Sequence, residues 1–186
     1  LLSAAEPTTS GMQVGMQLGT NVQLKESGGK TGWVLNPKNA GASYVRCKLD
    51  NDFMYDLKSE DTVEVTVEYL DDSYGGFSVY YDAQGGKRKA EFCPLTRTNN
   101  WLTHTFVLYD ARFANGINTD DFQIITDGTG KSVDENGIMD ASPWSVTISE
   151  IRVTKSAMKS PYKITAESGR TGNIFFEGDT ISFDIS

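Results

Sequence analysis

The sequence predicts an all-β protein, an antiparallel β-sandwich of the jelly-roll type. Side chains alternate between apolar and polar in one segment after another, which is the period of a half-buried strand. No segment carries a helical stripe of ten or more residues, and Gly-Gly or Asn-Gly turns recur between the short alternating segments. A single sheet would leave its apolar face in water, so two sheets are expected to pack against each other.

Four segments carry the alternation most clearly, and each predicts a strand with one inward face. The inward side chains in 61–70 are Val63, Val65, Val67 and Tyr69. Those in 77–82 are Phe77, Val79 and Tyr81, with Ser78, Tyr80 and Asp82 outward. Those in 101–110 are Leu102, His104, Phe106 and Leu108. In 145–153 they are Val146, Ile148, Ile151 and Val153, and the phase slip at Ser149 and Glu150 predicts a β-bulge.

The chain length and a change in residue composition near residue 155 predict one complete domain followed by part of another. Residues 1–10 form an N-terminal extension, 11–156 the sandwich, and 157–186 a linker with terminal strands that open a second domain or pack on the first. The boundary follows from "TKSAMKSPY", which is polar and interrupts the strand rhythm. The start, "LLSAAEP", is typical of the end of a secretory signal, and an arbitrary boundary is the alternative.

Charge and cysteine content restrict the partners. Seventeen basic and 25 acidic residues give a net charge of −8, which repels a phosphate backbone, so nucleic acid is not an expected partner. No apolar run is long enough to cross a bilayer, so a membrane is not expected either. Cys47 shares a face with Val45 and Leu49, which predicts a buried free thiol; a disulfide with Cys93 is the alternative.

Three stretches resemble a known class of module: "NDFMYDLKSEDTVEVTVEYLDDSYGGFSVYYDA", "WLTHTFVLYDARFAN" and "DDFQI". They resemble the non-catalytic carbohydrate-binding modules, of the galactose-binding, jelly-roll type, in secreted bacterial polysaccharide-degrading proteins. The stretch "GNIFFEGDTISFDIS" resembles the first strands of the immunoglobulin-like domains that follow such modules. The resemblance implies a polysaccharide or oligosaccharide ligand, neighbouring domains in the same chain, a monomeric module, and a secreted or cell-surface location. It transfers no binding residues onto this chain.

Sugar recognition requires exposed aromatic faces, because the C–H face of a pyranose ring is apolar. Tyr80 is predicted to point outward, near Thr66 and Glu68 if the two strands form a hairpin through "DDSYGG", with Tyr74 at the tip of that turn. The side chains considered as polar partners are Arg88, Asp72, Asp82 and Glu68.

Trp33 and Trp144 stand beside turn residues at strand starts, where sandwich loops gather. They are candidates for a loop-end clamp on a sugar, and plugging the open end of the sandwich is the alternative. In the clamp interpretation, replacing either by alanine abolishes retention on polysaccharide and leaves the thermal midpoint nearly unchanged. For Trp101 the resemblance implies a packing role.

Metal binding and catalysis are weakly indicated. The loop "TDGTGKSVDENGIMD" concentrates acidic side chains among glycines, which is compatible with a structural calcium ion or with a solvated acidic loop: Asp127, Asp134, Glu135 and Asp140. No other cofactor is expected. His104, the sole histidine, lies in the inward phase, and no G-x-S-x-G elbow occurs.

The sequence therefore predicts a non-catalytic carbohydrate-binding module that anchors a secreted enzyme to polysaccharide. The alternatives are a structural spacer or protein-interaction domain of a multidomain secreted protein, and a small glycoside hydrolase or lyase.

Overall fold

The computed structural model describes residues 2–3, 10–16, 23–35, 43–58, 61–126 and 145–156. This part of the chain forms twelve strands and no helix, so it also contains no helix that could span a bilayer. All paired strands run antiparallel.

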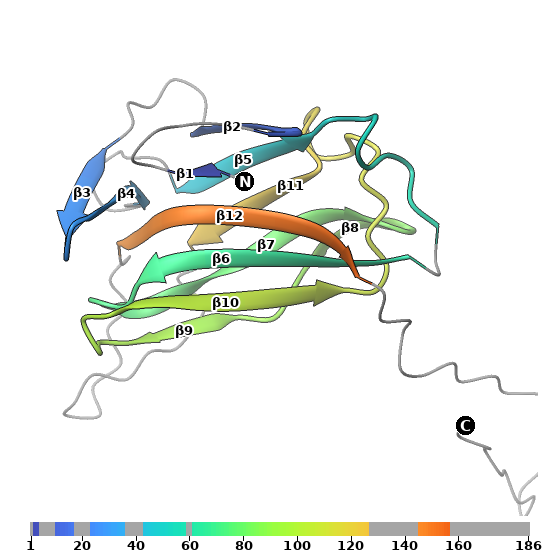
Figure 1. Ribbon diagram of the computed structural model, residues 1–186. Coiled ribbons are helices and arrows are strands. Elements are labelled where there is room, and N and C mark those ends of the chain that lie inside the picture. Colours follow the sequence, from blue (N-terminus) through green and yellow to red (C-terminus); the bar gives the residue numbers. More distant parts are fainter. Residues whose placement is uncertain are drawn as a thin grey trace, which may run out of the picture.

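The strands form two layers (Figure 1). The first sheet has the order β10 (Trp101–Leu108), β6 (Thr62–Leu70), β12 (Val146–Ser156), β4 (Lys30–Leu35), β3 (Leu24–Ser27), and β1 (Leu2–Ser3) pairs with β12. The second sheet has the order β2 (Met12–Met16), β5 (Tyr44–Leu49), β11 (Phe122–Thr126), β7 (Tyr74–Ala83), β8 (Gly86–Lys89), and β9 (Cys93–Thr96) also pairs with β7.

The connectivity is that of a jelly roll. Consecutive strands alternate between the sheets from β4 to β7 and again from β9 to β12. The eight strands concerned form two four-stranded layers, β4-β12-β6-β10 and β5-β11-β7-β9. The predicted all-β, jelly-roll sandwich is confirmed.

The apolar phases predicted from the sequence meet between the layers. Tyr69 of β6 lies edge-on to Phe77 of β7, with ring centroids 5.0 Å apart, and Phe77 contacts Phe106 of β10 at 5.8 Å. The predicted bulge in β12 is confirmed by a register shift between Ile148 and Glu150. Alternation along each strand therefore correctly assigned most of the core.

The predicted hairpin between β6 and β7 is wrong. The two strands lie in different sheets, and the short segment after Leu70 crosses from one layer to the other. Gly75 and Gly76 are consequently part of β7 rather than of a turn. Both strands bury one apolar face, and those faces can be buried against each other only across the core. Tyr80 and Glu68 thus belong to opposite layers.

Both cysteines are free and buried, so the predicted free thiol at Cys47 is confirmed and no disulfide joins it to Cys93. Burial raises the pKa of the Cys47 thiol well above its ordinary value. His104 has the predicted inward phase but is only half-buried, because β10 is an edge strand. Its ring contacts Phe106 at 4.5 Å, and Nε2 lies 3.1 Å from Oε1 of Glu91.

Gly76→Ala is expected to lower the free energy of unfolding by about 1–3 kcal/mol, the usual effect of overpacking. A Cβ at this position would lie 2.0 Å from the carbonyl oxygen of Cys93, which belongs to the paired strand β9 and cannot move alone. Chemical denaturation measures the loss. The matched control is Gly15→Ala in β2, where nothing lies within 4 Å of the added atom. Equal stability of the two variants would contradict the prediction.

Candidate functional site

Five residues form a row across the outer face of the second sheet, one from each successive strand. Strand pairing aligns them in the order Gly15, Arg46, Gln123, Tyr80, Lys89. Directly paired residues point to the same side of a sheet, and their inward neighbours, such as Cys47 and Phe122, are buried. The outer row therefore places the half-buried Tyr80 ring and Arg46 guanidinium on either side of the Gln123 amide, which is 8% exposed.

A buried carboxylate holds the polar half of the outer row. Asp120 accepts hydrogen bonds from Nε and Nη2 of Arg46 at 2.8 and 2.9 Å, and its side chain is only 4 % exposed. Nε2 of Gln123 also donates to Asp120, at 3.3 Å. The hydrogen bond from Arg46 to Asp120 outweighs desolvation and raises the pKa of Arg46, so the guanidinium stays charged. Two donors are thereby fixed in orientation before any ligand arrives.

The neighbouring row on the same face is more apolar. It contains Tyr44 of β5, Ile125 of β11 and Ser78 of β7, which are aligned by the pairing of these strands. Tyr44 and Ile125 are half-buried, like Tyr80, so their rings and methyl groups are partly accessible. The Ser78 hydroxyl is buried without a hydrogen-bond partner among the described residues. Apolar surface thus lies directly beside the donors of Arg46 and Gln123.

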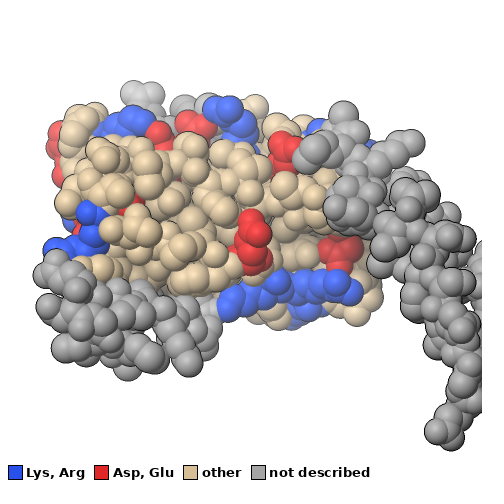
Figure 2. Space-filling model, turned by 90° about the horizontal axis from the view of Figure 1, so that it is seen from below, with Lys and Arg blue, Asp and Glu red and all other residues tan. Residues whose placement is uncertain are grey.

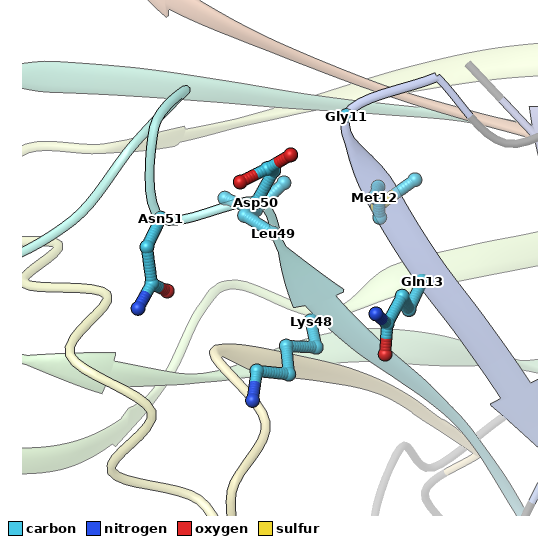
Figure 3. Close-up of a pocket in the computed structure, with 7 residues that line it drawn as sticks. All are labelled: Gly11, Met12, Gln13, Lys48, Leu49, Asp50 and Asn51. Carbon is cyan, nitrogen blue, oxygen red and sulfur yellow. The ribbon is translucent and has the colours of Figure 1, made fainter.

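A pocket continues this face at the β2–β5 edge (Figure 3). Its volume is about 430 Å³, within the range typical of small-ligand sites. The residues that line it are Gly11, Met12, Gln13, Lys48, Leu49, Asp50 and Asn51. Gln13 and Lys48 are paired across the two strands, and Figure 3 shows their side chains pointing to the same side.

The two predicted tyrosines have different surroundings. Tyr80 points outward and is half-buried, as the alternation predicted. Tyr74, at the start of β7, is covered by Arg97, whose guanidinium carbon lies 4.7 Å from the ring centroid. Nη1 of Arg97 also donates to the Tyr74 hydroxyl at 2.9 Å. Only Tyr80 belongs to the outer row.

For Trp33 the structure disagrees with an exposed clamp and agrees with the alternative, a tryptophan inside the sandwich. Trp33 is 8 % exposed and belongs to the core, because it occupies the inward phase of β4 together with Leu35. Trp144 lies outside the described residues, so the clamp that it was predicted to form stays untested. The packing role implied for Trp101 agrees with its contacts: Nε1 donates to the Ser27 carbonyl at 2.9 Å, and the ring packs so close to Gly32 that an added Cβ there would lie 3.0 Å from it.

The considered polar partners do not gather around Tyr80. Glu68 pairs with Lys30, and Asp72 pairs with Lys25, both of the first-sheet hairpin. Asp82 shares the face of Tyr80 but is 4 % exposed and accepts the N–H groups of Ala114 and Gly116. Arg88 pairs with Asp110 at 2.9 Å.

The predicted calcium loop cannot be assessed, since its acidic residues lie outside the described residues: Asp127, Asp134, Glu135 and Asp140. Within the described ranges, no group of three or more His, Cys, Asp or Glu side chains is placed to hold a metal ion. Calcium therefore stays a prediction.

Sequence reasoning missed Tyr44, Arg46 and Gln123. A signal existed for the first two, because Val45, Cys47 and Leu49 were assigned inward and the residues between them must then point outward. No local signal places Gln123 between Arg46 and Tyr80. That placement requires β11 to lie between β5 and β7, which the sheet order alone determines.

Comparison with known proteins found similarity to solved structures only; no family model and no curated protein matches the chain. One carbohydrate-binding module of family 29 is 13% identical, with 82% of this chain and 83% of that chain covered, at a TM-score of 0.44. A variant family 29 module in complex with cellulohexaose is 10% identical, with coverages of 79% and 93%, at a TM-score of 0.40. Because both TM-scores are below 0.5, these similarities do not establish the fold. The jelly-roll assignment depends on the strand order observed in this chain.

Proposed function

We propose that the chain is a non-catalytic carbohydrate-binding module and that the outer face of its second sheet binds the sugar. The observation that carries this proposal is the outer row, in which Tyr80 stands beside Gln123 and Arg46. The Tyr80 ring offers an apolar face to the C–H groups of a pyranose. The half-buried Arg46 offers hydrogen bonds to the hydroxyl groups at the ring edge, and the buried Gln123 helps to hold Asp120 beside it.

The immobilisation of these groups favours binding. Arg46 is held by Asp120 through two hydrogen bonds, so a ligand does not have to order the guanidinium. Avoiding that entropic cost supports affinity on a shallow face that buries little of the sugar. We expect a dissociation constant between about 1 μM and 1 mM for one module.

Three carboxylates near this face have structural partners, which favours binding over hydrolysis, and one more, Asp50, is exposed at the pocket. Glycosidases require two carboxyl groups free to act on the scissile bond. Asp120 is engaged by Arg46, Asp82 accepts two loop N–H groups, and Asp121 accepts the N–H groups of Leu49 and Asn115 at 2.8 and 3.0 Å. All three are buried, and each has a structural role.

The wider role belongs to the same proposal. A secreted or cell-surface enzyme would carry this module as a monomeric unit and be held by it on polysaccharide. Weak single-site affinity becomes useful when neighbouring modules of one chain bind together, because the second binding event is then intramolecular.

Affinity electrophoresis through gels containing single polysaccharides tests the proposal. The panel comprises glucomannan, xylan, β-glucan, pectin and alginate. Wild-type protein is expected to be retarded by at least one of them. Tyr80→Ala is expected to weaken binding about tenfold or more, which corresponds to about 1.4 kcal/mol of lost stacking. Tyr80→Phe should retain most of the retardation.

The matched control is Tyr109→Ala, which removes an exposed tyrosine just beyond β10 in the first sheet. It should leave retardation unchanged. Absence of retardation of the wild type in every gel would contradict the proposal and favour a spacer or protein-interaction domain. Release of reducing sugar from the same panel would contradict the non-catalytic assignment.

A further inference from the structure

Basic side chains lie on both sides of Tyr80, within the outer row and next to it. Arg46 and Lys48 point outward from β5, two residues apart, and Lys87 and Lys89 do so from β8. Lys87 and Lys89 are exposed, and Arg46 and Lys48 are half-buried. Between β5 and β8 lie three strand spacings of about 4.8 Å, or about 14 Å in all. A polysaccharide strand lying over Tyr80 would therefore have cations along each margin.

Three of the four carboxylates near this face are buried, and the fourth, Asp50, is exposed at the rim of the pocket. Asp82, Asp120 and Asp121 are 4%, 3% and 1% exposed, and each is engaged by the hydrogen bonds described above. Apart from Asp50, the charged side chains of β5, β7, β8 and β11 that reach solvent on this face are cations, although the protein carries a net charge of −8. Screening limits the reach of that net charge to about 8 Å at physiological ionic strength, so a ligand in contact with this face interacts mainly with the local cations.

Two of these cations, Lys48 and Lys87, form no direct ion pair with another side chain in the part of the chain that the structure describes, although Lys48 acts electrostatically on the buried Asp121. Arg46 binds Asp120 through Nε and Nη2, and among the described residues its Nη1 forms no hydrogen bond. Figure 3 shows the Lys48 amine on the side opposite the Asp50 carboxylate. Lys48 therefore lines the 430 Å³ pocket without a direct ion pair among the described residues, and Asp50 lines the same pocket.

The outer face of the first sheet differs in this respect. There Glu68 pairs with Lys30, and Glu150 pairs with Arg152 at 2.8 Å. Charges on that face neutralise each other. Uncharged side chains dominate the view of the molecule in Figure 2, and Lys and Arg side chains form a row along its lower margin. Asp and Glu side chains lie beside this row in the same view.

We infer that the outer face of the second sheet selects an acidic polysaccharide, with Lys48, Lys87 and Arg46 binding its anionic groups and the pocket beside Lys48 receiving one sugar ring. This inference rests on the proposed function, since the aromatic and guanidinium contacts to the sugar are those of the outer row. The anionic group is a uronate carboxylate or a sulfate ester, because ammonium and guanidinium groups bind both.

Pairs of ligands that share a backbone but differ in charge separate the effect of ligand charge on affinity from the effect of the sugar. Polygalacturonate and its fully methyl-esterified form share one backbone and differ in charge, and alginate and a sulfated galactan supply the two anionic groups on other backbones. We expect the full chain to bind at least one acidic polymer about tenfold more tightly than the neutral ester or glucomannan. The preference should disappear between 50 mM and 500 mM NaCl, because salt screens exposed pairs.

The variant Lys48→Gln/Lys87→Gln is expected to lose about tenfold in affinity for the acidic polymer and to keep its affinity for neutral ones. The control variant, Lys25→Gln/Lys58→Gln, changes the net charge equally at exposed sites away from this face and should bind like the wild type. Thermal unfolding of both variants checks that they remain folded.

The remaining outcomes overturn the inference in distinguishable ways. Equal binding of polygalacturonate and its ester would refute acidic selection and leave carbohydrate binding intact. Binding of no polymer would refute the proposed function as well. Equally tight binding of single-stranded poly(dT) would indicate a general polyanion site, and equal effects of the two double variants would place the site elsewhere.

Discussion

Asp71→Ala is expected to lower the free energy of unfolding by about 3 kcal/mol at pH 7, because it removes the buried carboxylate that accepts five hydrogen bonds. The Asp71 carboxylate is fully buried where the chain crosses from β6 to β7. It accepts the backbone N–H groups of Thr96, Arg97 and Thr98 at 2.6, 3.1 and 2.9 Å, and the hydroxyls of Thr96 and Thr98 at 2.9 and 2.7 Å. Chemical denaturation at pH 7 measures the loss.

The contribution of Asp71 should depend on pH. Desolvation raises the pKa of the carboxyl, but the hydrogen bonds from Thr98 and Thr96 outweigh it, and the folded-state pKa is lowered. A lowered pKa means that the stabilisation is present above the unfolded-state value of about 3.9 and is lost as pH falls through the folded-state value. The stability difference between wild type and Asp71→Asn is therefore expected to shrink on acidification from pH 5 to pH 2.

The matched control for this site is Asp72→Asn. Asp72 is adjacent in sequence and forms an ion pair with Lys25 of the hairpin, whose side chain is 47 % exposed. An exposed pair contributes about 0–1 kcal/mol, so this variant should be nearly as stable as the wild type. If Asp71→Asn and Asp72→Asn proved equally stable at every pH, the role assigned to the buried carboxylate would be wrong.

Trp33→Ala is expected to lower the free energy of unfolding by about 3–5 kcal/mol, the usual effect of truncating a buried large aromatic side chain. Trp33 is buried in the core, where it is aligned with Ile148 of β12. The Trp33→Ala molecules that remain folded should still bind sugar. The loop-end interpretation of the sequence requires the opposite: lost binding at unchanged stability.

Leu24→Ala is the control. Leu24 is paired with Trp33 across the β3–β4 hairpin, but it is 59 % exposed, so its truncation should change stability by less than about 0.5 kcal/mol. Thermal and denaturant unfolding of both variants, combined with affinity electrophoresis, separates the two interpretations. A stable Trp33→Ala protein that no longer binds sugar would return Trp33 to the binding site.

Local alternation determined which side chains face inward, and it did so without knowledge of the neighbouring strands. Cys47 was correctly assigned to the core and Tyr80 to the outside, and the bulge in β12 was located by its phase slip. These properties depend on a repeat of two residues within one strand, so they can be read from a few consecutive residues. The jelly-roll class follows from the same pattern combined with the recurrent turns.

Which strands lie side by side was decided only by the tertiary structure. The sequence neighbours β6 and β7 are in opposite sheets, whereas β5, β11 and β7, far apart in sequence, are adjacent and bring Arg46, Gln123 and Tyr80 into one row. Pairing of strands depends on how all the apolar faces can be buried at once, a condition on the whole chain. The strand phases were therefore predictable from the sequence, but the site that those phases assemble was not.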